Sequence, residues 1–146
     1  MLKIQKGITN QQIGGVFITN SISEPIGLLY GLSGIFHGNT ILISSQIRKL
    51  TFGRGNDQTN TPNDVFIGIN DLLLSRSHCK IRISPVEGEQ PPKRRNYEWR
   101  ILDLASSNGT YVNGKEVRRT ENGDILENGD NIQVGDSTLL VKIFNK

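Results

Sequence analysis

The sequence has only one cysteine, Cys79, and lacks any long apolar run. A single cysteine cannot form a disulfide within the chain, and it cannot supply a cysteine-rich zinc site. No apolar stretch approaches the roughly 20 residues that a bilayer crossing needs, and the N-terminus lacks the apolar core of a secretory signal. These absences predict an intracellular protein, nuclear or cytoplasmic, that makes no membrane contact.

Motifs of enzymes and of metal sites are also missing. Neither the G-x-x-x-x-G-K-[ST] phosphate loop nor the G-x-S-x-G nucleophile elbow occurs. The acidic segment that begins at Asp124 does not match a calcium-binding loop. Leu126 and Gly135 would occupy ligand positions, and neither has a side-chain oxygen to bind calcium. We therefore expect a binding protein with no catalytic residues, no cofactor and no metal.

The charge of the chain is mildly positive, with a formal net charge of +3. The one basic cluster, Lys93-Arg94-Arg95, follows two prolines and is typical of a solvated loop between strands. The pattern gives no reason to expect direct binding of nucleic acid.

Turn residues and strand residues fill most of the sequence. Four Asn-Gly pairs, the first at Asn108-Gly109 and the last at Asn128-Gly129, favour tight reversals and leave no room for helices between them. Around them lie short β-prone segments, and in one of these Ile81 and Ile83 alternate with charged residues. Many short strands without a helical period predict an all-β sandwich or barrel.

The first 25 residues differ in composition from the rest. They are polar apart from a brief apolar insert, and Pro25 ends them. We expect residues 1–25 to be an N-terminal extension that is flexible or adds a strand, and residues 26–146 to form the main domain.

Four short motifs follow one another along this domain. They are Gly53-Arg54, Ser75 to His78, Asp103 to Thr110 with Asn113-Gly114, and Leu126 to Gly135. In this order and spacing the sequence resembles the forkhead-associated (FHA) domain. The resemblance implies an eleven-stranded FHA/SMAD-like β-sandwich, with a ligand-binding loop face at one end that binds phosphothreonine peptides in kinase-driven signalling, such as DNA-damage or cell-cycle pathways.

The resemblance also assigns roles to individual residues. Those expected to contact the phosphopeptide are Arg54, Ser75, Arg76, Ser107 and Asn108. The loops expected to set specificity contain Leu73, Gly135, Asp136 and Ser137. Residues expected to support the site are Gly53, His78 and Gly109, with His78 bracing its loop from beneath by hydrogen bonds.

Two residues outside the four motifs have ordinary structural interpretations. Cys79 follows His78 directly and is expected to be a small buried hydrophobe, with no role as a redox switch. Trp99 alternates with Tyr97 and Ile101, which is typical of a core or sheet-face position.

Two further functions stay open at this level. The domain can be a phosphorylation-independent scaffold or dimerisation module that uses a sheet face, or the regulatory fragment of a longer enzyme such as a kinase. The partner expected first is a phosphothreonine-containing protein. The chain is then a monomer or, if Thr9 or Thr19 is phosphorylated and occupies a neighbour's site, an oligomer.

Overall fold

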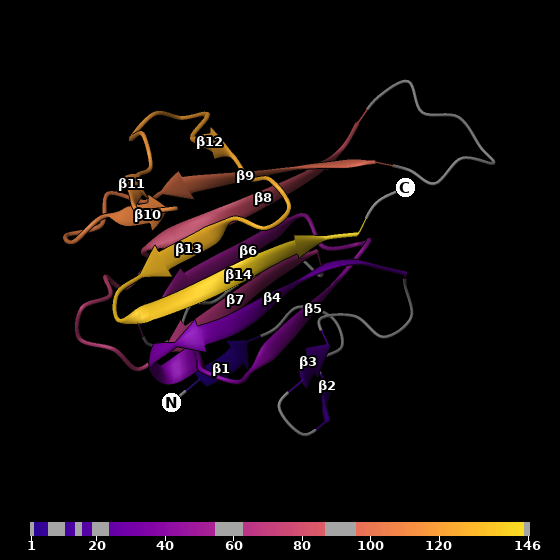
Figure 1. Ribbon diagram of the computed structural model, residues 1–146, viewed down its shortest axis with the longest axis horizontal. Coiled ribbons are helices and arrows are strands. Elements are labelled where there is room, and N and C mark those ends of the chain that lie inside the picture. The colour runs from indigo at the N-terminus through magenta and orange to yellow at the C-terminus, as the bar shows by residue number, and fades with distance from the viewer. Residues whose placement is uncertain are drawn as a thin grey trace.

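Two β-sheets pack face to face in the computed structural model, which describes residues 2–5, 11–13, 16–18, 24–54, 63–86 and 96–144 (Figure 1). The described strands are β1 (Leu2–Gln5), β2 (Gln11–Ile13), β3 (Val16–Ile18), β4 (Pro25–Ser33), β5 (Thr40–Ser44), β6 (Lys49–Gly53), β7 (Asp64–Ile69), β8 (Cys79–Pro85), β9 (Tyr97–Asp103), β10 (Thr110–Val112), β11 (Lys115–Glu116), β12 (Asp124–Ile125), β13 (Asn131–Val134) and β14 (Ser137–Ile143). A short 3-10 helix, η1 (Gly34–Phe36), follows β4. The predicted all-β sandwich is confirmed, and β4 to β14 match the eleven strands that the resemblance implies.

The order of the strands brings distant parts of the chain together. One sheet has the order β1-β7-β6-β8-β9-β12, and the other has the order β11-β10-β13-β14-β4-β5-β3-β2. Strands β6 and β7 pair parallel, as do β3 and β5. The ends of β6, β7, β9 and β13 therefore lie at the same end of the sandwich as the starts of β8, β10 and β14.

Alternation along the strands separates the core from the surface. In β8, Cys79, Ile81 and Ile83 are buried, whereas Lys80 and Arg82 face outward and are half-buried. Such alternation is typical of a sheet with one buried face and one solvated face. The inward residues of both sheets form one core: Ile26, Leu29, Phe36, Ile41, Ile43, Ile47, Leu50, Phe52, Val65, Ile67, Ile69, Leu74, Cys79, Ile81, Ile83, Trp99, Ile101, Val117, Leu126, Ile132, Val134, Leu139 and Val141.

Trp99 is the largest side chain of this core, with 1% of its surface exposed. Its indole ring packs against the backbone of β4 at Gly27, where a Cβ atom would lie 2.7 Å from the ring. Burial of Trp99 and of Cys79 agrees with the interpretation of both from the sequence. Burial also raises the pKa of the Cys79 thiol, which keeps the thiol protonated and unreactive.

The N-terminal segment contributes strands to both sheets. β1 pairs with β7 at the edge of the six-stranded sheet, and β3 pairs with β5 in the eight-stranded sheet. The sequence predicted at most one such strand, because each of these segments has only three or four residues. Thr9, Thr19 and the Lys93-Arg94-Arg95 cluster lie outside the described residues. Among the described residues, no helix has the length and hydropathy that a membrane crossing requires.

Candidate functional site

The predicted site residues come together at the end of the sandwich where β6, β7, β9 and β13 terminate (Figure 1, left). Two loops dominate this end, and we call them the 70–78 loop, between β7 and β8, and the 104–109 loop, between β9 and β10. The end of β6 and the β13–β14 turn lie beside them.

Arg54 lies at the end of β6, directly against the 70–78 loop. Its backbone N–H donates to the carbonyl oxygen of Ser75 over 3.0 Å. The preceding residue must be glycine, because a Cβ atom at Gly53 would overlap the carbonyl oxygen of Arg76. This close approach brings the backbone of Gly53 and Arg54 against Ser75 and Arg76.

Both arginines present their charge to solvent. Arg54 and Arg76 are exposed, and neither guanidinium has an ion pair within the described part of the chain. Two exposed arginines without an ion pair among the described residues are therefore backbone neighbours of Ser75.

The Ser75 hydroxyl also connects the two loops. The backbone N–H of Ser107 donates to the Ser75 oxygen over 3.0 Å. Because that oxygen accepts from Ser107, the hydroxyl hydrogen of Ser75 remains able to donate to a ligand. Ser107 itself is exposed beside it.

His78 is fully buried beneath the same two loops. The Ser75 N–H donates to its Nδ1 over 3.1 Å, and Nε2 lies 2.7 Å from the carbonyl oxygen of Gly109. A backbone N–H can only donate, so Nδ1 accepts and the ring proton is on Nε2, which donates to Gly109. The imidazole thus joins the backbones of the 70–78 and 104–109 loops.

Asn108 bridges the loops on the exposed side. Its side-chain Nδ2 donates to the carbonyl oxygen of Leu73 over 2.7 Å. This bond uses one of the two amide hydrogens, and it leaves the other hydrogen and the amide oxygen for a ligand. The next residue, Gly109, has a φ of +84°, which glycine adopts readily.

Asp103, the first residue of the motif Asp103 to Thr110, supports the 104–109 loop from below, a role that was not predicted from the sequence. Its carboxylate accepts from the hydroxyls of Ser106 and Thr110 over 2.6 and 2.7 Å, and from the Ser106 N–H over 2.9 Å. A guanidinium nitrogen of Arg119, Nη1, lies 3.4 Å from Oδ2 of Asp103. Burial opposes ionisation of Asp103, but the hydrogen bonds from Ser106 and Thr110 and the charge of Arg119 outweigh it and hold the pKa of this carboxyl below its usual range.

Asp71 performs a similar task for the predicted specificity loops, and it too was missed. Its two carboxylate oxygens accept from the N–H groups of Leu73 and Asp136 over 2.9 and 2.7 Å. Gly135, with a φ of +57°, packs against the same carboxylate. Leu73 and the β13–β14 turn are therefore held next to each other, whereas Ser137 is fully buried and its side chain is not available to a ligand.

A pocket of about 280 Å³ opens between these loops. Its lining consists of Leu73, Asn108, Gly109, Tyr111, Gln133 and Gly135. Tyr111 and Gln133 face each other across β10 and β13, and the sequence reasoning missed both. Only the register of those two strands brings them to the pocket, so no local signal marks them.

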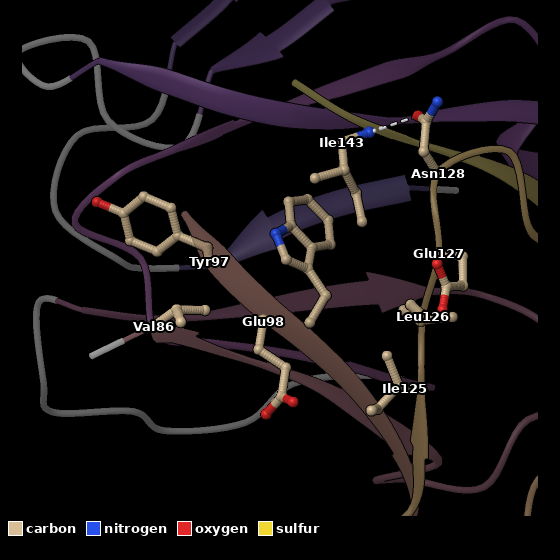
Figure 2. Close-up of a pocket in the computed structure, with 9 residues that line it drawn as sticks. Val86, Tyr97, Glu98, Ile125, Leu126, Glu127, Asn128 and Ile143 are labelled. Carbon is tan, nitrogen blue, oxygen red and sulfur yellow. Dashed lines mark hydrogen bonds between the residues drawn. The ribbon is translucent and has the colours of Figure 1, made fainter. Parts of the chain in front are cut away.

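A second pocket, of about 360 Å³, lies elsewhere, where β8 and β14 end and β9 begins (Figure 2). Tyr97, Glu98, Ile125 and Ile143 are among its lining residues, and none of the predicted site residues contributes to it. The described residues also contain no group of three side chains that could hold a metal ion.

Comparison with known proteins agrees with this arrangement. The family model of the FHA domain matches residues 50–135. A solved FHA domain from a study of phosphothreonine-dependent FHA domain interactions is similar over 83% of this chain and 99% of that chain, with 26% identity and a TM-score of 0.56.

Two curated bacterial proteins are similar over part of their length. The oxoglutarate dehydrogenase inhibitor of Corynebacterium efficiens is 37% identical over 73 residues, which are 50% of this chain and 39% of that protein. The glycogen accumulation regulator GarA of Mycolicibacterium smegmatis is 29% identical over 115 residues, 75% of this chain and 62% of that protein. The chain thus spans less than two thirds of the length of either relative. Because the family match covers more than half of its 146 residues, the chain belongs to the FHA domain family.

Proposed function

We propose that this chain is a phosphothreonine-dependent protein-interaction module that binds phosphothreonine peptides at the 70–78 and 104–109 loops. One observation carries the proposal. Two exposed arginines are backbone neighbours of Ser75, Arg54 through a hydrogen bond and Arg76 in the chain, and the Ser75 hydroxyl keeps a hydrogen to donate.

The chemistry of a phosphate fits this set of donors. A phosphothreonine carries about −1.5 to −2 charge near neutral pH and has three strong acceptor oxygens. Arg54, Arg76 and Ser75 supply charge-assisted hydrogen bonds, each worth about 1.5–3 kcal/mol. Micromolar binding requires about 8 kcal/mol in total, so these contacts and a few to the peptide backbone suffice after the cost of association.

Asn108 and Ser107 are proposed to contact the peptide next to the phosphate. The free N–H and the amide oxygen of Asn108 match the C=O and N–H groups of an extended peptide. The bond from Asn108 to Leu73 holds the amide in one orientation before the peptide arrives. Less conformational freedom is then lost on binding.

The pocket between the loops is proposed to accept a side chain that flanks the phosphothreonine. Leu73 and the ring of Tyr111 give it apolar walls, and Gln133 adds an amide. A side chain with an aliphatic stem and a hydrogen-bonding end complements this lining. Gly135 is part of this lining, and Asp136 follows it in the turn that Asp71 holds, so both affect the shape of the pocket more than its chemistry.

The wider role that we infer is regulatory and non-catalytic. The curated relatives are an inhibitor of oxoglutarate dehydrogenase and a regulator of glycogen accumulation, both from bacteria. The bacterial source of both relatives favours regulation inside a bacterial cell, and it lends no support to a nuclear or DNA-damage setting.

An oriented phosphopeptide library tests this function directly. We expect the full chain to enrich phosphothreonine peptides over their unphosphorylated and phosphoserine versions, with a preference at one flanking position. Ser75→Ala should lose this enrichment, and Arg118→Ala is a control, because Arg118 is exposed and its ion pair is with Asp124, which is not a residue of either loop. Equal recovery of all three peptide classes by the unaltered chain would refute the proposal.

A further inference from the structure

The outer face of the six-stranded sheet carries three basic side chains in one row. Lys49 of β6 is opposite Arg82 of β8, and Arg82 is opposite Arg100 of β9. Their strand neighbours, such as Leu50 and Ile81, point into the core, so alternation directs the three basic side chains outward. Directly opposed residues have Cβ atoms about 4.5–5.5 Å apart.

The positive charge of this row is only partly compensated. Lys49 lies 3.4 Å from Asp64, and Arg100 lies 3.1 Å from Glu98. Arg82, between two cations, has no ion pair within the described ranges, and Lys80 is a further cation on the same face of β8. Four cations therefore face two carboxylates, and like charges in directly opposed positions destabilise a sheet.

We propose that this face, the Lys49–Arg82–Arg100 row with Lys80, binds an acidic segment of a partner polypeptide in extended conformation. Strands β6, β8 and β9 are consecutive in the sheet, so the row is about 10 Å long. In an extended segment, carboxylates at positions i and i+2 are about 7 Å apart and point the same way. Two such carboxylates fit along the row, on either side of Arg82.

The surroundings of the row favour a short acidic segment over a nucleic acid. Asp64 extends the row beyond Lys49, and Glu98 lies beside Arg100 on β9. Both carboxylates repel a long polyanion that continues past the row. A segment with two or three acidic side chains avoids them.

This surface is separate from the proposed phosphopeptide site. Arg82 is three residues along β8 from Cys79, about 10 Å from the start of the strand that follows the 70–78 loop. One partner can therefore present a phosphothreonine to the loops and an acidic segment to the sheet. Binding of the acidic segment does not require phosphorylation.

The test titrates the full chain with an unphosphorylated peptide that has glutamate at alternate positions. Binding is monitored through the backbone amide chemical shifts of the chain in NMR spectra. A peptide of equal length with glutamine in place of glutamate is the control. We expect shifts in β6, β8 and β9 for the glutamate peptide alone, and weaker binding as the salt concentration rises. Arg82→Glu should weaken binding at least about tenfold, because it adds repulsion and removes attraction.

The melting temperature shows whether Arg82→Glu loses binding through its changed charge or because the variant unfolds. Arg82→Glu places a carboxylate between Lys49 and Arg100, so the melting temperature of the variant should rise while binding is lost. Lys142→Glu, at an exposed position of β14 in the other sheet, makes the same charge change and should leave binding unchanged.

Several outcomes would overturn the proposal. The first three are equal shifts with the glutamine peptide, no shifts at all, and shifts confined to residues 73–78 and 104–109. The fourth is binding of duplex DNA to the row that is tighter than binding of the glutamate peptide. Arg54→Ala distinguishes the two proposals, because it should remove phosphopeptide binding and leave the acidic peptide bound.

Discussion

The loop end of the sandwich and the outer face of the six-stranded sheet both present basic side chains, but they hold them in different ways. At the loop end, buried side chains bond to the backbones of two loops, as His78 does between Ser75 and Gly109. On the sheet, strand pairing sets Lys49, Arg82 and Arg100 side by side, and among the described residues no buried side chain beneath them bonds to a loop. A substitution beneath the loops therefore changes shape, whereas a substitution on the sheet changes only charge.

The largest effect is expected from Asp103→Ala. The change leaves the buried hydroxyls of Ser106 and Thr110 without their acceptor, at about 1–3 kcal/mol for each group. We expect the free energy of unfolding to fall by about 2–5 kcal/mol, measured by chemical denaturation, and phosphopeptide affinity to fall with it. A loss under about 0.5 kcal/mol would show that the loop does not depend on this carboxylate.

His78→Ala should have the next largest effect. It removes the acceptor of the Ser75 N–H and the donor to Gly109, and it leaves a cavity beneath both loops. We expect a loss of about 2–4 kcal/mol in unfolding free energy together with weaker phosphopeptide binding. If the free energy of unfolding is unchanged and only affinity is lost, His78 contacts the ligand itself. It then does not belong with the residues that only support the loops.

Arg54→Ala should act on binding alone. Arg54 is exposed and its side chain has no partner within the described residues, so the free energy of unfolding should change by less than about 0.5 kcal/mol. Loss of one charge-assisted contact should weaken phosphothreonine binding by about 1.5–3 kcal/mol, roughly 10- to 150-fold, measured by calorimetry. Arg118→Ala, which opens an exposed ion pair with Asp124, is the control and should leave binding unchanged.

The smallest effect is expected in the pH dependence of stability, through the carboxyl group of Asp103. The pKa of Asp103 is lower in the folded chain than the value of about 3.9 for a free aspartate, so the folded state binds fewer protons at this group. Its contribution to stability is complete above pH 4 and is lost as the pH falls through the lowered pKa. Asp103→Asn should remove this part of the acid sensitivity, seen as a flatter unfolding free energy between pH 4 and pH 2. An unchanged slope would assign the sensitivity to other carboxyls.

Much of the fold was predictable because its signals are local. Alternation in β8 and the turns at the Asn-Gly pairs predicted a sheet structure, and the burial of Trp99 and Cys79 agreed with that pattern. The strands before Pro25 were harder to predict, since each has few residues and depends on a distant partner in β7 or β5.

The candidate site was predictable only in part. Motif spacing indicated the loops that contain Arg54, Ser75 and Asn108, and the structure brings all three together. Asp71 was missed because a buried aspartate that accepts backbone N–H groups has no distinctive pattern in the sequence. Ser137 was expected in a loop that sets specificity, and its side chain is fully buried at the start of β14.

The sequence alone determined the class of fold and the loops of the site, because alternation, turn residues and motif order are properties of neighbouring residues. The tertiary structure decided which side chains support those loops and which basic residues share a face. Asp103 reaches Thr110 across a loop, and Arg82 meets Lys49 and Arg100 through strand register. Such contacts depend on pairing between distant segments, which short-range patterns do not specify.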